Sequence, residues 1–243
     1  MSLSKRLVGA VVLFGMSLVL NAKSVGATEA DPLDLTIGKV TVTEVSDESS
    51  SSELRFSDRS LNSVSGLSEV AAEVDALQVV FDKVVNLGQK VWNLVEAGKP
   101  VVRTQWATAN ALPEGVQSWR QMSGWENPRA RVYRVHFENL YGVTVADFSF
   151  RVTYLAGGNI NGVGQYLSRV SVEPANLLVR WGYNFEASAE VADVVNVGSA
   201  QSPVAGMELL VKWKVSTVMN QIESTASYFV RGDGEMVDLT SGN

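Results

Sequence analysis

From residue 130 almost to the C-terminus, apolar residues recur at every second position, and this pattern constrains the fold more than any other feature. Such alternation gives a β-strand one dry and one solvated face. Turn-forming Gly, Pro and Asn residues separate the alternating segments. The sequence therefore predicts a mainly β protein, an antiparallel β-sandwich or wrapped sheet of about six long strands. The predicted strands fall within 130–138, 148–154, 165–173, 177–185, 207–215 and 225–231.

Two tryptophans lie on the alternating stripes. Trp181 belongs to the most regular stripe, from Leu177 to Phe185, and Trp213 belongs to the stripe from Met207 to Val215. Because every other residue of these stripes is apolar, we expect both indoles in the core.

Residues 68–97 show a different period, which predicts one long N-terminal amphipathic helix. Ser68 is a suitable N-cap, and Gly98 followed by Pro100 is a stop signal. The alternative is an α+β fold in which the helix lies across a curved antiparallel sheet. Gly88 occupies one position of the apolar stripe, whose other members follow a 4,3,4,3 spacing: Val70, Val74, Leu77, Phe81, Val84, Val91 and Val95.

The first 27 residues have the layout of a secretory signal peptide. Lys5 and Arg6 precede an apolar run, Leu7 to Leu20, that is short for a membrane span. Val25-Gly26-Ala27 places small residues at a cleavage site. We therefore expect an exported protein, periplasmic or extracellular, whose mature chain begins near Thr28.

Residues 28–64 are polar and Ser-rich, which predicts an arm or linker. Within the arm, the β-branched alternation from Leu35 to Thr43 can pair as an edge strand. We expect residues 65–243 to form a single domain that combines the helix and the sheet.

Charge and composition exclude several classes of protein. Without Lys5, Arg6 and Lys23, 17 of the 20 basic residues remain against 26 acidic ones, a charge of about −9. Such a chain is poorly suited to nucleic acid or to anionic membrane surfaces. The absence of cysteine excludes disulfides, thiol nucleophiles and cysteine–metal sites. No second apolar stretch is long enough for a stable membrane span.

The sequence contains no recognisable catalytic, cofactor or metal motif. A catalytic triad or a histidine metal site would have to use His136, which is the single histidine. We interpret it as a solvated strand residue paired with Glu138 or Glu186. Glycan hydrolysis needs only two carboxylates, so a carboxylate-dependent glycan hydrolase is the alternative function. The carboxylates available for it are Glu138, Asp147, Glu173, Glu186 and Glu190.

The segment 101–130 holds the candidate binding residues. Aromatic and arginine side chains on a loop can stack on sugar rings or anchor a protein partner. The alternative is that these indoles cover the end of the sandwich. We expect a non-enzymatic binding or structural module of the cell envelope or extracellular matrix, which binds a polysaccharide or protein partner without a cofactor or metal. The candidate residues are Trp106, Trp119, Arg120, Trp125 and Arg129.

Overall fold

The computed structural model describes residues 34–45, 79–96, 99–100 and 107–240. The chain divides into two compact units, 1–30 and 31–243, and all of the described residues belong to the second. The predicted signal peptide and most of the predicted arm lie outside the described residues.

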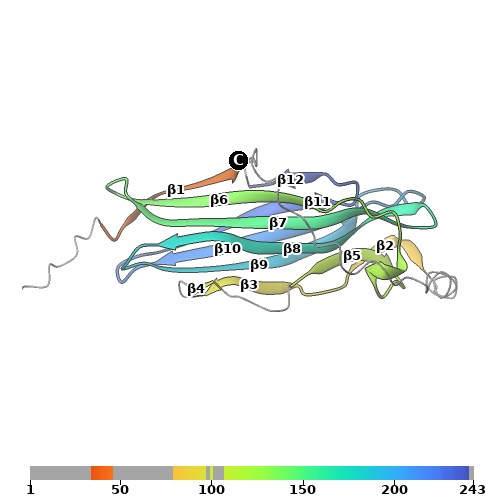
Figure 1. Cartoon of the computed structure of the whole chain (residues 1–243), viewed down its shortest axis with the longest axis horizontal. Helices are drawn as coiled ribbons and strands as arrows, with labels where there is room; N and C mark the ends of the chain where they lie inside the picture. The colour runs from red at the N-terminus through yellow and green to blue at the C-terminus, as the bar shows by residue number, and fades with distance from the viewer. Residues whose placement is uncertain (1–33, 46–78, 97–98, 101–106, 241–243) are drawn as a thin grey trace, which may run out of the picture. The chain divides into compact units, whose positions relative to one another are not determined.

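The described residues form two antiparallel sheets of six strands (Figure 1). The first sheet has the order β1-β6-β7-β8-β5-β2, and the second has the order β12-β11-β10-β9-β3-β4. The prediction of a mainly β, antiparallel fold is confirmed. The strands are β1 (Ile37–Val45), β2 (Val80–Asn86), β3 (Val91–Glu96), β4 (Lys99–Pro100), β5 (Ala109–Glu114), β6 (Arg129–Asn139), β7 (Thr144–Ile160), β8 (Val163–Val179), β9 (Asn184–Asn196), β10 (Ala205–Ser216), β11 (Gln221–Arg231) and β12 (Met236–Asp238).

Aromatic rings join the inner faces of the two sheets. The ring centroids of Tyr133 and Tyr228 are 4.3 Å apart, and those of Phe148 and Phe185 are 5.0 Å apart. Phe150 meets Tyr228 edge-on at 5.9 Å. All five side chains are fully buried, and each such ring pair stabilises by about 0.5–1.5 kcal/mol beyond the burial of its area. The core therefore lies between the two sheets.

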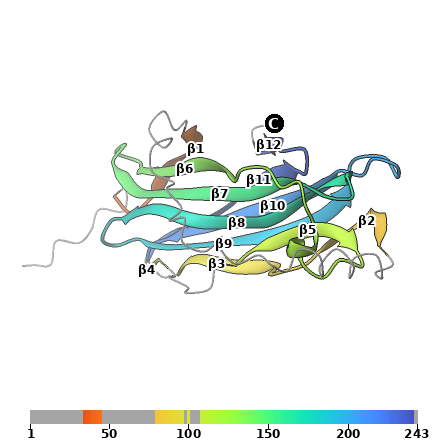
Figure 2. The same ribbon diagram turned by 45° about the vertical axis from the view of Figure 1, so that its right-hand side comes forward.

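Backbone hydrogen bonds also link the two sheets at one end. The amide of Gln165 donates to the carbonyl of Pro203 at 2.9 Å. Gly157 donates to Gly232 at 2.8 Å, and Gly232 in turn donates to Ala205 at 2.7 Å. The sheets thus wrap toward each other at this end (Figure 2).

The predicted helix over 68–97 is wrong for its described part, because residues 79–96 form strands β2 and β3 instead. Residues 68–78 of that prediction lie outside the described residues, and no α-helix occurs in the described residues. Gly88, with φ +140°, carries the chain from the first sheet to the second. A Cβ at Gly88 would lie 2.3 Å from the carbonyl oxygen of Thr108, so the position requires glycine.

The cause of the error is visible in the same segment. β-branched valines favour strands over helices, and β2 and β3 carry several of them. Trp92 and Leu94, which widen the apolar stripe of the predicted helix, are instead buried as alternate residues of β3. The Trp92 indole donates across the core to the carbonyl of Val172, at 3.0 Å. Two short strands in different sheets therefore produce an apolar spacing that resembles a helix.

The prediction that Trp181 lies in the core is also wrong. Trp181 is 92% exposed, whereas Trp213 is 3% exposed, as predicted. The predicted strand 177–185 is interrupted by a tight turn, in which the amide of Tyr183 donates to the carbonyl of Arg180 at 3.2 Å. A two-residue turn preserves a period of two, so the alternation continues from β8 into β9 although the chain reverses.

The predicted edge strand within 35–43 is confirmed. β1 pairs antiparallel with β6 over the whole length of β1 and forms one edge of the first sheet.

Alkaline pH should destabilise this core. Burial raises the pKa of Tyr133 and of Tyr166 from the ordinary value of 10.0 to about 12. In the unfolded chain these phenols ionise near pH 10, while the folded chain keeps them neutral up to about pH 12. The free energy of unfolding should therefore be unaffected by them below pH 10 and should fall as the pH rises from 10 to 12.

Urea unfolding followed by circular dichroism at a series of pH values would measure this decline. Burial also raises the pKa of Tyr154, Tyr183 and Tyr228. Tyr133→Phe removes one of these titrations and should make the decline shallower. A free energy of unfolding that stays constant up to pH 12 would contradict the assignment of these phenols to the core.

Candidate functional site

The structure places four of the five predicted binding residues on or beside one segment, 117–129. Trp119 and Arg120 belong to a short 3₁₀ helix, η2 (Trp119–Gln121), Trp125 follows it, and Arg129 begins β6. Trp106 lies outside the described residues.

Trp119 and Trp125 contact each other and the core. Their ring centroids are 6.3 Å apart in an edge-on arrangement, and the Trp125 indole donates to the Trp119 carbonyl at 3.2 Å. The Arg120 guanidinium lies 5.8 Å from the Trp119 ring. Both indoles are half-buried and pack against the core. Trp125 lies so close to Gly158 that a Cβ there would be 2.2 Å from the ring.

Side-chain caps and backbone pairing hold the segment in place. The Ser118 hydroxyl accepts from the amide of Arg120 at 3.3 Å, and the Gln121 side chain accepts from the amide of Ser118 at 3.1 Å. Such a reciprocal cap satisfies amides that a short helix leaves free. Further along, the amide of Glu126 donates to the carbonyl of Ala156 at 2.9 Å. The segment therefore forms an ordered extension of the first sheet.

Arg129 connects this segment to the turn between β11 and β12. One guanidinium nitrogen pairs with Glu126 at 2.7 Å, and the other donates to the carbonyl of Gly234 at 2.7 Å. The Tyr154 hydroxyl donates to the same carbonyl at 3.0 Å. These contacts fix the position of the Arg129 side chain, which also lines a pocket.

This pocket, which we call the arginine pocket, has a volume of about 570 Å³. It lies on the outer face of the first sheet and is lined by three arginines from three adjacent strands, Arg129 on β6, Arg151 on β7 and Arg169 on β8. Trp119, Arg120 and Trp125 are not among its lining residues, so Arg129 is the only one of the four described candidate residues that lines this pocket. The pocket is also lined by Thr108, Thr153, Leu155, Ser171 and Glu173.

A β-bulge places Arg169 in the pocket. The pairing of β7 with β8 changes register between Thr153 and Leu155, next to Arg169. Arg169 has φ +51°, a left-handed conformation that is costly for a residue with a side chain. The Asn110 side chain accepts from the amide of Arg169 at 3.0 Å and from the Ser168 hydroxyl at 2.9 Å. Bulges commonly redirect side chains next to functional sites.

A chain of polar side chains forms the floor of the pocket. The hydroxyls of Thr153 and Ser171 are 2.7 Å apart, and Ser171 donates to a carboxylate oxygen of Glu173 at 3.0 Å. Burial raises the pKa of Glu173 above its ordinary value, and the Ser171 hydrogen bond and the charges of Arg151 and Arg169 offset only part of that rise.

Arg151 and Arg169 are available for a ligand. Among the described residues, neither guanidinium has a carboxylate within ion-pair distance, although the chain has a net charge of −6. Guanidinium groups match carboxylates, sulfates and phosphates with paired hydrogen bonds. The arrangement can therefore hold an anionic group beside hydroxyl donors and the apolar side chain of Leu155.

The sequence interpretation did not identify Arg151 and Arg169. The alternation of β7 places Arg151 on the polar face, which is a readable signal. The approach of Arg169 depends on the pairing register and on the bulge, and no local pattern reveals either.

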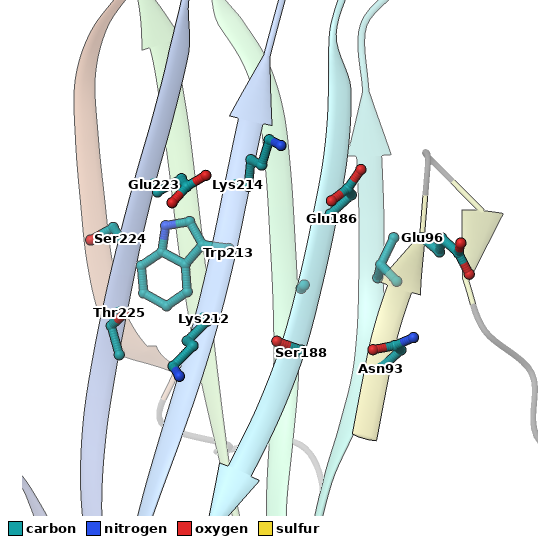
Figure 3. A pocket seen from close by; sticks show the side chains of 12 residues that line it. Asn93, Glu96, Glu186, Ser188, Lys212, Trp213, Lys214, Glu223, Ser224 and Thr225 are labelled. Carbon is teal, nitrogen blue, oxygen red and sulfur yellow. The ribbon is translucent and has the colours of Figure 1, made fainter. Parts of the chain in front are cut away.

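A second, smaller concavity of about 330 Å³ lies on the outer face of the second sheet (Figure 3). Here Lys214 lies between Glu186 of β9 and Glu223 of β11, its direct neighbours in the pairing register. Lys212 pairs with Glu190 at 2.6 Å. Because cations and anions alternate across these strands, this face is largely neutralised by its own side chains.

His136 belongs to a separate ion-pair group on the outer face of the first sheet. Its ring nitrogens lie 3.5 Å from Glu138 and 3.4 Å from Asp147, so the predicted pairing with Glu138 is present. Arg134 holds Asp147 with two hydrogen bonds from its Nε, at 2.9 and 3.0 Å, and lowers the pKa of that carboxyl. Within the part of the chain that the structure describes, no three His, Cys, Asp or Glu residues are grouped as a metal site. In that same part, no helix is long and apolar enough to cross a membrane.

The contact of Trp125 with Gly158 predicts a non-additive pair of substitutions. Gly158→Ala inserts a methyl group into the indole and should lower the free energy of unfolding by about 1–3 kcal/mol. In a Trp125→Ala background the same methyl group fills vacated space. The double variant should therefore be no less stable than Trp125→Ala alone, as measured by urea unfolding. Additive losses would show that the indole does not pack on Gly158.

No family model matches the chain, and no solved structure matches it. Among curated proteins, a methionine synthase of Saccharolobus solfataricus is 28% identical over 118 residues, which cover 49% of this chain and 34% of that protein. Methionine synthases from two strains of Saccharolobus islandicus match with the same identity and coverage.

The matched stretch spans about a third of the length of these curated relatives. This partial similarity does not place the chain in their family.

Proposed function

We propose that this protein is an exported, non-enzymatic binding module of the cell envelope or extracellular matrix, and that its ligand is an acidic polysaccharide held at the arginine pocket. The proposal of export is supported by the basic and apolar layout of residues 1–27.

The observation that carries the proposal is the pair Arg151 and Arg169. These two cations line one pocket of an acidic chain, and no carboxylate of the described residues pairs with either. The backbone of Arg169 is held in a costly conformation, and that conformation adds no ion pair to the fold. A role in ligand binding accounts for both features.

The lining of the pocket favours a sugar acid over a simple anion. A uronic acid presents a carboxylate, several hydroxyls and an apolar ring face. In the pocket, the guanidinium groups can bind the carboxylate, and Leu155 can contact the apolar ring face. The hydroxyls of Thr108, Thr153 and Ser171 can form hydrogen bonds with the hydroxyls of the sugar. Its volume of about 570 Å³ lies within the range of about 300–1,000 Å³ that is usual for ligand pockets.

The alternative, a carboxylate-dependent glycan hydrolase, needs a second carboxylate about 5–10 Å from the first. Among the described residues that line the arginine pocket, Glu173 is the one carboxylate. The raised pKa of Glu173 suits a proton donor. Its charged neighbours in the pocket are arginines, however, and not the second carboxylate that hydrolysis requires. The lining therefore supports binding more strongly than hydrolysis.

Arg169→Gly tests the proposal because it separates binding from stability. It removes the guanidinium, and glycine adopts a positive φ without strain. Binding to polygalacturonate should weaken by about tenfold, as expected for the loss of one charge-assisted contact. The free energy of unfolding should stay constant or rise by up to about 1 kcal/mol. Isothermal titration calorimetry and urea unfolding would measure the two quantities.

Arg151→Gln should weaken binding to a similar degree. Lys214→Gln, on the outer face of the second sheet, is the matched control and should leave binding unchanged. Equal binding to neutral dextran, or full binding by both arginine variants, would exclude the arginine pocket as the site of an acidic polysaccharide. Cleavage of the polymer would favour the hydrolase instead.

A further inference from the structure

Three hairpin turns meet at the end of the sheets where β1 begins (Figure 1). They are the β6–β7 turn (140–143), the β8–β9 turn (180–183) and the β10–β11 turn (217–220). Residues 34–36 touch all three. The amide of Leu140 donates to the Thr36 carbonyl at 3.1 Å, the Thr217 hydroxyl donates to the Leu35 carbonyl at 3.3 Å, and the Tyr183 hydroxyl donates to the Asp34 carbonyl.

The tips of these turns expose large apolar side chains, and we call this surface the apolar end. Trp181 and Val218 are each 92% exposed. Met219 is 59% exposed, and Leu140 and Tyr141 are each 54% exposed. Several large hydrophobic residues exposed together on one end of a unit indicate an interaction surface.

The turns at the other end differ in chemistry. The β7–β8 turn is Asn161-Gly162, and the β11–β12 turn is Gly232-Asp233-Gly234-Glu235. The longer β9–β10 connection, 197–204, begins with Val197, which is 41% exposed, and continues with Gly198-Ser199-Ala200-Gln201-Ser202. Small and polar residues are what solvated hairpin turns normally require. The accumulation of Trp, Tyr, Leu, Val and Met at the apolar end is therefore not a consequence of hairpin formation.

The apolar turns are held in fixed conformations. The Asn139 side chain accepts from the amides of Tyr141 and Val143, at 3.0 and 2.9 Å. The Thr217 hydroxyl accepts from the amides of Met219 and Asn220, at 3.2 and 2.9 Å. Because the backbones are already ordered, little conformational entropy is lost when the tips bind a partner.

We propose that the apolar end docks on the surface of a zwitterionic lipid bilayer, with Trp181, Val218 and Met219 inserted among the headgroups and upper acyl chains. Trp and Tyr prefer this interfacial region because each combines an apolar ring with a polar group. Separate hairpin tips can enter a fluid bilayer independently, whereas a protein partner would need a matching recess for each.

The charges at the apolar end suit such a surface. Arg180 is the one charged residue in the three turns, and the carboxylate of Asp34 lies beside them, where it accepts from the Asn139 side chain. The net charge of −6 opposes approach to an anionic membrane but not to phosphatidylcholine. Binding should therefore depend on apolar insertion and should persist at high salt.

The absence of cysteine in the chain allows a direct test. Val218→Cys and Ala200→Cys each provide one labelling site for an environment-sensitive fluorophore, at the apolar end and at the opposite end respectively. With phosphatidylcholine vesicles and the mature chain from Thr28, the label at position 218 should shift to the emission of an apolar environment, and the label at position 200 should not. The shift should survive high salt.

A second variant tests the energetics. Trp181→Ser combined with Met219→Ser should lower the vesicle-bound fraction by at least about tenfold, because two inserting side chains are lost. Val195→Ser combined with Val197→Ser, near the opposite end, is the matched control and should bind like the parent. Both variants begin at Thr28, without the apolar run Leu7 to Leu20, so any difference between them arises from the turns.

Three results would overturn the proposal. The label at position 218 could remain in water while the protein is bound, or the double serine variant could bind vesicles as tightly as the parent. A shift that appears without lipid and grows with protein concentration would instead assign the apolar end to contact between two copies of the chain.

Discussion

The layer of aromatic rings between the two sheets is the interaction on which the rest of the structure depends. Tyr133, Phe148 and Phe150 face Phe185 and Tyr228, and their burial gives the two sheets a common core. Because side chains alternate along each strand, fixing the inner set also fixes which residues point outward. The remaining positions available for function are therefore the outer faces, the sheet edges and the turns.

The two outer faces obey the same alternation but differ in electrostatics. On the second sheet, Lys212 and Lys214 lie among acidic neighbours, so the face is close to neutral. On the first sheet, Arg151 and Arg169 converge on one pocket beside Glu173, the cross-strand neighbour of Arg151, and among the described residues neither guanidinium has a carboxylate within ion-pair distance. Unpaired cations on an acidic chain attract anionic ligands at a distance. None of these charged side chains packs in the core. The electrostatic difference between the two outer faces therefore arises only from where the charged residues are placed on the strands.

The sequence predicts much of the fold, because the alternation in β6, β7, β10 and β11 is a property of each strand alone. The prediction is wrong where two consecutive elements together give the apolar spacing of a single element. In 79–96, two short strands in different sheets give a helix-like spacing, and in 177–185 a tight turn preserves the alternation and hides Trp181. The arginine pocket was only partly predictable: Arg129 follows from the loop composition, whereas the position of Arg169 depends on a bulge that only the pairing of β7 with β8 creates.

The residues at the tips of the turns are a part of the sequence that the stability of the fold does not determine. Asn139 and Thr217 fix the backbones of two turns through their own side chains, so the residues at the tips contribute little to stability. A tip residue such as Val218 or Trp181, at 92% exposed, could be polar at no cost to the core. Exposed apolar groups reduce solubility and promote association. Their presence at one end, with polar turns at the other, is a feature that folding alone does not explain, and an interaction at that end does.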